Sequence, residues 1–352
     1  MRLLKIVFIT YLTIGLTKSF AQDISFSQFN SLGSYYNPAL TGSFDGNFKV
    51  RIINRDHWVK FADAPYRTFG ISGDIKFDQS SKDFKGDFLA LGAYFISDRG
   101  QILDWNKNEM GVSIAYHKLL DKIKKTYLSG GITLGILQRS ISYDNIYFED
   151  QFDGLDRYNG STNEILPQNI HATPDLKVGL NYSTRMSKLW AIQIGSGMHY
   201  IFRPNFSFYK SLEDINYSGT KESKALIRTN TILNFSYKLD NFRQLFPKFY
   251  FATQGPLQIL QAGINYRQSF YSLNQTAVHA GLSLRSVSSS SFLTPVDLGF
   301  LLGFEVKRFI IGMQYDIGLR DALKYGNPTH SFEISISLIG DYTNEGFICP
   351  EF

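Results

Sequence analysis

Ser331-Phe332-Glu333-Ile334-Ser335-Ile336-Ser337-Leu338, close to the carboxyl end of the chain, alternates apolar and polar residues without a break. An extended strand turns successive side chains to opposite faces, so this stretch has one apolar face and one polar face. Such a strand fits a half-buried position in a soluble β-sandwich and equally the wall of a membrane β-barrel. The rest of the chain must decide between these two classes.

The same alternation recurs along the chain, for example in segments 111–116, 260–267, 278–285 and 309–317. The polar faces of these segments carry Gly, Ser, Asn and Gln with an occasional charge. This composition is typical of the water-filled or plugged interior of a membrane barrel, whereas a soluble surface strand would carry more Lys and Glu. The repeated pattern favours an all-β fold, a transmembrane antiparallel β-barrel.

Period-two alternation and turn residues predict about fourteen strands. The expected spans are 46–54, 68–77, 87–97, 109–117, 125–138, 174–183, 189–202, 224–238, 248–253, 257–269, 276–287, 296–306, 309–317 and 329–339. Most of these spans are near the roughly 9–11 residues that a tilted strand needs to cross a bilayer.

The lengths of the connections support an outer-membrane barrel, which has long extracellular loops and short periplasmic turns. The longest expected connections, 139–173 and 203–223, follow the fifth and seventh strands and therefore lie on the same side. Two connections do not fit this asymmetry. The outer turn 254–256 is short, and the inner connection 240–247 is long.

The amino terminus has the features of a secretory signal peptide. Residues 1–21 contain a basic start, an apolar run over 6–16 and the small-x-small sequence Ser19-Phe20-Ala21. The apolar run is too short for a transmembrane helix of about 20 residues. We therefore expect an exported chain, cleaved before Gln22, that is integral to the outer membrane of a Gram-negative cell.

The expected organisation is one barrel domain with short flanking segments. The signal peptide is followed by a lead-in or plug over 22–45, which has turn residues but no sustained period. The transmembrane barrel covers 46–339, and a C-terminal tail covers 340–352.

Bulk composition excludes several classes of function. Without the three cations of the signal peptide the formal net charge falls from +5 to +2, which gives no basis for nucleic-acid binding. The single cysteine, Cys349, excludes an internal disulfide and a cysteine-based metal cluster. Aromatic residues make up 15% of the chain, which suits the aromatic girdles of a membrane barrel.

No pattern of catalytic or metal-binding residues stands out. The six His residues show no H-E-x-x-H spacing, and the chain contains neither a P-loop nor a G-x-S-x-G motif. We expect no cofactor, no metal site and no enzymatic activity, although the sequence leaves open a set of Ser, Asp and His at the barrel rim.

Residues on the expected polar faces have alternative interpretations. Charged side chains there either line a pore, bind a plug or pair with one another across the lumen; they include Lys177, Arg228, Glu305 and Asp316. Glycines inside the expected strands either make room for a plug or relieve curvature in the wall; these are Gly130, Gly131, Gly195 and Gly197.

Short motifs near both ends resemble those of the PorP/SprF family of outer-membrane proteins. The motif residues are Phe26, Ser27, Gln28, Asn37, Pro38, Ala39, Gly42, Arg55, Trp58, Cys349, Pro350 and Phe352. Segments 307–316 and 330–335 are similar to the last two strands of the family. Where the family usually has Tyr-Arg-x-Gln-Trp, this chain has Asn54-Arg55-Asp56-His57-Trp58, so the polar residue before the tryptophan is changed.

The resemblance implies a barrel of the type IX secretion and gliding apparatus of Bacteroidetes. Such a barrel would help to secrete or anchor a cargo protein, often an adhesin, by receiving its C-terminal sorting domain at the cell surface. It would also contact periplasmic or lipoprotein components of the secretion and gliding machinery. The alternative function, suggested by the polar lumen faces, is an outer-membrane channel or transporter for small ligands.

Aromatic residues in the two long loops are candidate partner-binding residues, because aromatic side chains are enriched in protein interfaces. They are Phe148, Phe152, Tyr158, Phe206, Phe208 and Tyr209. The alternative is that these side chains only fold the loops onto the barrel mouth.

Overall fold

The computed structural model describes residues 25–57, 66–78, 86–100, 104–144, 146–155, 157–158, 160–164, 166–208, 224–270, 276–288, 293–319 and 329–340. The predicted signal peptide and almost all of the predicted C-terminal tail lie outside these ranges, as do the motif residues Trp58, Cys349, Pro350 and Phe352.

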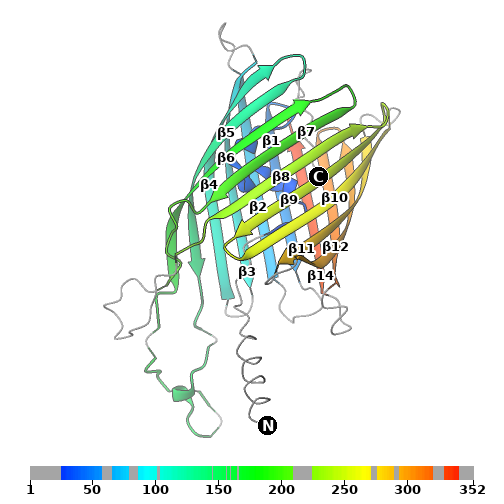
Figure 1. Cartoon of the computed structure of the whole chain (residues 1–352). Helices are drawn as coiled ribbons and strands as arrows, with labels where there is room; N and C mark the ends of the chain where they lie inside the picture. The colour runs from blue at the N-terminus through cyan, green and yellow to red at the C-terminus, as the bar shows by residue number, and fades with distance from the viewer. Residues whose placement is uncertain are drawn as a thin grey trace, which may run out of the picture.

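The described residues form fourteen strands joined into one closed barrel (Figure 1). The strands are β1 (Phe48–His57), β2 (Tyr66–Asp78), β3 (Phe88–Gly100), β4 (Trp105–Asp121), β5 (Thr126–Ser140), β6 (Ile170–Arg185), β7 (Trp190–His199), β8 (Arg228–Lys238), β9 (Arg243–Gln254), β10 (Leu257–Phe270), β11 (Thr276–Ser288), β12 (Leu293–Val306), β13 (Phe309–Gly318) and β14 (His330–Ile339).

Each strand pairs antiparallel with its neighbours in the sequence, and β1 pairs with β14 to close the cylinder. The closing register places Arg51 opposite Ser337 and Arg55 opposite Glu333. Closure matters because a bilayer offers no water to the backbone N–H and C=O groups of an open sheet edge. The expected all-β transmembrane barrel of fourteen strands is therefore confirmed.

The alternation in β14 shows which face of the wall meets the lipid. Glu333 and Ser335 are buried, whereas Phe332 and Ile336 are 39% and 40% exposed. The apolar side chains thus face outward and the polar side chains face inward, the reverse of a soluble sandwich. The same holds for Leu282 and Ile264, which are 51% and 44% exposed.

The predicted strands all occur, and the largest shift of a single strand end is at the start of β9. The prediction began this strand at residue 248, directly after Pro247, which cannot donate a hydrogen bond to a sheet ladder. The observed strand continues back to Arg243, and its pairing with β8 is interrupted between Leu245 and Lys248. The connection to β8 is consequently short, which removes one of the two exceptions to the loop asymmetry.

The lead-in segment before β1 lies inside the barrel (Figure 1). It consists of three single turns, η1 (Phe29–Leu32), α2 (Gly33–Tyr36) and η2 (Pro38–Leu40). We call residues 25–47 the plug. No helix among the described residues is both long and apolar enough to cross a bilayer.

The plug begins near the end of the barrel that carries the long loops and finishes at the opposite end. Ser25 accepts a hydrogen bond from Arg55, which lies near the end of β1, whereas Phe44 packs with Ile310 and Ile339 beside the short turns. We call these the loop end and the turn end of the barrel. The plug therefore crosses most of the lumen before the chain enters β1 at the turn end.

A charged residue on the outward face should destabilise the barrel according to its depth in the bilayer. Leu134, near the middle of β5, is 65% exposed, and Leu120, near the turn end of β4, is 56% exposed. We expect Leu134→Arg to lower the free energy of unfolding by about 2–4 kcal/mol and Leu120→Arg by about 1 kcal/mol or less. Urea unfolding in lipid vesicles measures both, and equal losses would contradict this placement in the membrane.

Candidate functional site: the plugged lumen

The first anchor of the plug is formed by the Ser27-Gln28 pair and the carboxylate of Glu333. The backbone N–H groups of Ser27 and Gln28 donate to the two oxygens of Glu333 at 2.5 and 2.9 Å. Glu333 is fully buried, so it needs partners that offset its lost hydration. The two amides of the plug supply part of this compensation.

Arg55 completes the charge balance of the first anchor. One of its guanidinium nitrogens lies 3.1 Å from Glu333 and donates to the carbonyl oxygen of Ser25. A second ion pair joins Arg55 to Asp316 at 3.7 Å. Because Arg55 and Glu333 face each other in β1 and β14, the closing pair of strands also holds the plug.

Further side chains from distant strands converge on the same two plug residues. The hydroxyl of Ser27 donates to Asp316 and accepts from Arg285, and its carbonyl oxygen accepts from Gln261 at 2.7 Å. On the neighbouring residue, Ser335 donates to the side-chain oxygen of Gln28 at 2.7 Å. The first anchor thus draws on five strands: β1, β10, β11, β13 and β14.

The second anchor is formed by Tyr36 and Asn37 on the opposite wall of the lumen. The amide nitrogen of Asn37 donates to the carbonyl of Leu180 at 3.0 Å, and its side-chain oxygen accepts from the backbone of Ala39, capping η2. The carbonyl of Tyr36 lies 3.1 Å from Nε2 of His199. These contacts tie the middle of the plug to β6 and β7.

Glycines in β5, β6 and β7 let the second anchor approach the wall. A Cβ atom at Gly131 would lie 2.4 Å from the carbonyl carbon of Pro38, and one at Gly197 would lie 2.3 Å from the carbonyl oxygen of Tyr36. Gly179 and Gly195 are equally close to the side chain of Asn37. The interpretation that strand glycines make room for a plug is confirmed for Gly131, Gly195 and Gly197.

Gly130 behaves differently from its neighbour. Its Cβ would meet only the side chain of Leu180, at 3.9 Å. It lies one residue from Gly131 and therefore points away from the plug. Gly130 provides a natural control for the glycines that contact the plug.

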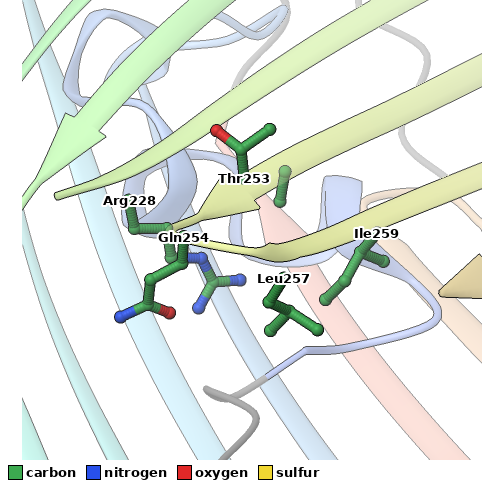
Figure 2. A pocket seen from close by; sticks show the side chains of 6 residues that line it. Arg228, Thr253, Gln254, Leu257 and Ile259 are labelled. Atoms are coloured by element: carbon green, nitrogen blue, oxygen red, sulfur yellow. The ribbon is translucent and has the colours of Figure 1, made fainter. Parts of the chain in front are cut away.

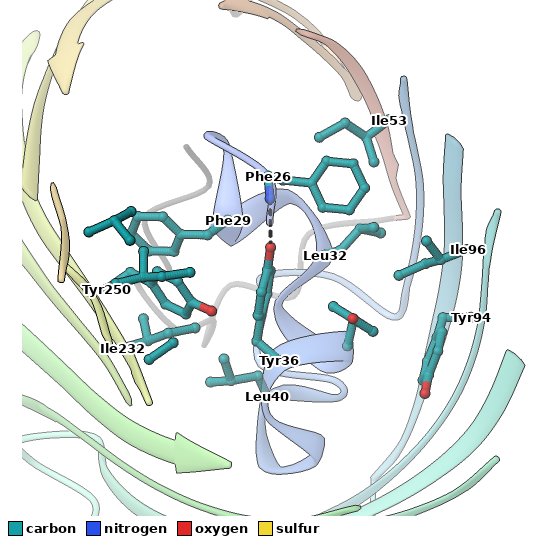
Figure 3. Close-up of a cluster of buried hydrophobic side chains, with 14 residues drawn as sticks. Phe26, Phe29, Leu32, Tyr36, Leu40, Ile53, Tyr94, Ile96, Ile232 and Tyr250 are labelled. Carbon is teal, nitrogen blue, oxygen red and sulfur yellow. Dashed lines mark hydrogen bonds between the residues drawn. The ribbon is translucent and has the colours of Figure 1, made fainter. Parts of the chain in front are cut away.

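An aromatic cluster fills the space between the two anchors (Figure 3). The rings of Phe29 and Tyr250 stack with centroids 5.3 Å apart, and Tyr35 meets Tyr94 edge to face at 5.5 Å. The backbone N–H of Phe26 donates to the hydroxyl of Tyr36, which closes the plug on itself. Aromatic packing of this kind leaves little open volume in the lumen.

The four charged residues singled out on the polar faces have different partners. Asp316 contacts the plug through Ser27, and Lys177 pairs with Glu109 while its ammonium group lies 4.1 Å from the centre of the Tyr35 ring. Arg228 donates to Asn230 and Tyr250 within the wall. Glu305 pairs with Arg267 and His279, also within the wall. Some lumen charges therefore bind the plug and others pair with the wall.

A small cavity remains beside the plug at the loop end (Figure 2). It is lined by Arg228, Ala252, Thr253, Gln254, Leu257 and Ile259. Its volume of about 10 Å³ has room for about one water molecule and is far below the roughly 300–1,000 Å³ of typical small-molecule pockets. Within the described part of the chain, no group of His, Cys, Asp and Glu has the geometry of a metal site.

The candidate partner-binding aromatics fall into two groups. Phe206 packs in a cluster with Leu137 and Tyr200 at the barrel mouth, and Phe208 lies edge-on to His171. These two side chains help to fold the β7–β8 connection onto the mouth, as the alternative interpretation proposed. Tyr209 lies outside the described residues.

The aromatics of the β5–β6 connection lie farther from the barrel. Phe152 and Tyr158 are 44% and 46% exposed, and their ring centroids are 5.1 Å apart. Tyr147, also well exposed, packs against Tyr158, and Phe148 is half-buried. These residues form an exposed aromatic cluster on a long extension of the loop end, which Figure 1 shows in green.

Comparison with known proteins bears on the whole chain. A family model described as "Type IX secretion system membrane protein PorP/SprF" matches residues 18–338. The search of curated proteins gave no match.

Solved structures with similar folds are outer-membrane channels. The TodX toluene transporter of Pseudomonas putida is 10% identical with a TM-score of 0.50, covering 90% of this chain and 98% of TodX. A deltaS2 mutant of the TodX monoaromatic hydrocarbon channel is 11% identical with a TM-score of 0.52, covering 86% of this chain and 92% of that one. At this identity the likeness concerns the fold alone.

A side chain at Gly131 should displace the plug, whereas one at Gly130 should not. The probe is a cysteine in place of the buried Ser31, in a Cys349→Ser background, so that maleimide reacts only at the plug. We expect Gly131→Val to speed labelling by about tenfold or more, equivalent to about 1.4 kcal/mol, because Pro38 must move. Gly130→Val should label at the parental rate. Equal rates in the two variants would contradict the glycine fit.

Removing the charge of Glu333 should loosen the first anchor. Glu333→Gln keeps the shape of the side chain but leaves only one oxygen for the amides of Ser27 and Gln28. In planar-bilayer recordings we expect the unaltered protein to be closed to ions and Glu333→Gln to show brief openings. Glu305→Gln removes a lumen carboxylate that does not contact the plug and should stay closed. Openings in both variants, or in neither, would show that Glu333 does not hold the plug.

Proposed function

The chain belongs to the PorP/SprF family of type IX secretion system membrane proteins, and we propose that it helps to secrete or anchor a cargo protein. The barrel is the membrane protein of a secretion family and shares its fold with outer-membrane channels. In the proposal it acts without catalysis, receives the C-terminal sorting domain of a cargo such as an adhesin, and serves gliding motility and surface attachment.

The plugged lumen is the observation that carries this proposal. Two anchors, an aromatic cluster and a glycine-lined wall hold residues 25–47 inside the barrel. A lumen filled in this way supports a role in which the outer surface of the barrel, rather than a pore, contacts the partner. The connections at the loop end remain available for a large partner.

The orientation follows from the lengths of those connections. Bacterial outer-membrane barrels place long loops outside the cell and short turns in the periplasm. We therefore assign the loop end to the cell surface and the turn end to the periplasm. The exposed aromatic cluster around Phe152 and Tyr158 then projects from the cell surface, where the sorting domain of a cargo would arrive.

A channel for small ligands is the second candidate. It is favoured by the likeness to the TodX structures, a toluene transporter and a monoaromatic hydrocarbon channel. Bilayer recordings of the unaltered protein separate the two functions. A steady conductance that small aromatic solutes block would replace the anchoring role with the channel role.

The aromatic cluster of the β5–β6 connection should be needed for retention of the cargo. We expect the double variant Phe152→Ala/Tyr158→Ala to lower surface-attached cargo by about tenfold or more, because loss of an aromatic anchor at an interface commonly costs about 2 kcal/mol. Surface-attached cargo is measured by protease treatment of intact cells. A strain without the barrel sets the lower limit.

The matched control for this variant is Phe202→Ala, a 64% exposed aromatic on the neighbouring connection. It should retain the parental amount of cargo. If a strain that lacks the whole barrel still attaches and secretes its cargo normally, the proposed function is wrong. If the barrel-deficient strain loses its surface-attached cargo but the double variant retains the parental amount, another surface of the barrel receives the cargo.

A further inference from the structure

The turn end of the barrel carries a basic, partly apolar surface that the plug and the loop end do not involve. It is formed by the β4–β5 and β6–β7 turns, and we call it the basic rim. Its residues are Lys122, Ile123, Lys124, Arg185, Met186 and Lys188. A backbone hydrogen bond from Arg185 to the carbonyl of Lys124, 2.9 Å long, joins the two turns into one surface.

Charge on the basic rim is of one sign. The single nearby acid of these turns, Asp121, accepts hydrogen bonds from the backbone N–H groups of Ile123 and Lys124 at 2.8 and 3.0 Å. Its carboxylate is thus engaged within the turn itself. The turn is held in one conformation, so Ile123 is presented outward without the cost of ordering a mobile loop.

Two apolar side chains stand among these cations. Ile123 is 93% exposed and Met186 is 65% exposed. Burying an isoleucine side chain is favourable by about 2 kcal/mol relative to leaving it in water. Exposed apolar patches rimmed by polar residues mark surfaces that bind proteins or membranes.

The β4–β5 turn projects beyond the lipid-facing wall (Figure 1). On the outward face, Lys118 pairs with Asp87 at 2.8 Å, and Tyr116 donates to the same carboxylate. Ionised groups on this face mark the edge of the hydrocarbon layer, because burying them in lipid is costly. From Lys118 the strand continues for three residues to its end at Asp121, about 8 Å along the barrel axis at the usual rise and tilt, and the turn extends beyond it. Ile123 therefore lies in the aqueous phase.

Other described turns at this end do not share these properties. In the β8–β9 turn, Asp240 pairs with Arg243 at 2.6 Å. The β12–β13 turn consists of Lys307 and Arg308 alone, directly between the outward-facing Val306 and Phe309, and so ends level with the lipid belt. Among the turns that the structure describes, only the basic rim combines positive charge, exposed apolar side chains and projection into water.

We propose that the basic rim is the docking surface for a soluble periplasmic protein with an acidic surface and an apolar depression that accepts Ile123. The proposal rests on the orientation given under the proposed function and adds to it the place and chemistry of the periplasmic contact. Charge complementarity selects an acidic partner, and the distance from the bilayer favours a protein over lipid headgroups. Steering by opposite charge would speed its association.

The test is photo-crosslinking in living cells that express the full-length barrel. The photoreactive residue p-benzoylphenylalanine replaces Ile123, and the adducts are identified by mass spectrometry. We expect one discrete protein adduct whose partner has an acidic surface. The same residue in place of Val112, which is 64% exposed on the lipid-facing wall, should give lipid adducts only.

Charge reversal identifies the contribution of the cations. Lys122→Glu/Lys124→Glu should reduce the protein adduct at position 123 by about tenfold or more, because two attractive charges become repulsive. The control Lys307→Glu/Arg308→Glu makes the same change in net charge at the same end of the barrel and should leave the adduct unchanged. Loss of the adduct in both variants would mean that overall charge, rather than the basic rim, decides binding, and would overturn the proposal.

The remaining outcomes are also decisive. Lipid adducts at position 123, no adduct at all, or a protein adduct that is indifferent to Lys122→Glu/Lys124→Glu would each overturn the proposal. A failure of the proposed function is recognised by a different result, because a barrel-deficient strain would then attach its cargo normally. In that case a charge-dependent adduct would still assign a docking role to the basic rim.

Discussion

The ion pair between Arg55 and Glu333 joins three parts of the structure at one point. The two residues face each other where β1 and β14 close the barrel. The same side chains bind the carbonyl of Ser25 and the amides of Ser27 and Gln28. One interaction therefore contributes at once to closure of the cylinder, neutralisation of a buried carboxylate and retention of the plug.

The strands and the lumen could be predicted from the sequence because both follow from a local pattern. Alternation along 331–338 reports the two faces of β14 whatever lies elsewhere in the chain. The start of β9 could not be predicted, since Pro247 forbids a ladder hydrogen bond but not an extended conformation. At that point the pairing with β8 is interrupted, whereas the pairing with β10 continues.

The candidate site was predictable in its parts but not in its contacts. The resemblance marked Ser27, Gln28 and Asn37, and the polar face of β14 was visible in the sequence. However, Gln28 and Glu333 are separated by 305 residues. Only the register accumulated around all fourteen strands brings them together, and that register depends on every turn and pairing rather than on one stretch of sequence. The exposure of the loop aromatics could not be predicted either, because it depends on how each connection folds. Phe152 is exposed, whereas Phe206 packs against the barrel mouth.

The first anchor also bears on how the molecule is assembled. Its partners for Ser27 and Gln28 come from strands of the last third of the barrel, ending with β14. A chain that has inserted only its early strands has the plug but lacks Glu333, Arg285 and Gln261 to hold it. The first anchor can therefore form only when the last strands are in place, and its presence distinguishes a finished barrel from an incomplete one.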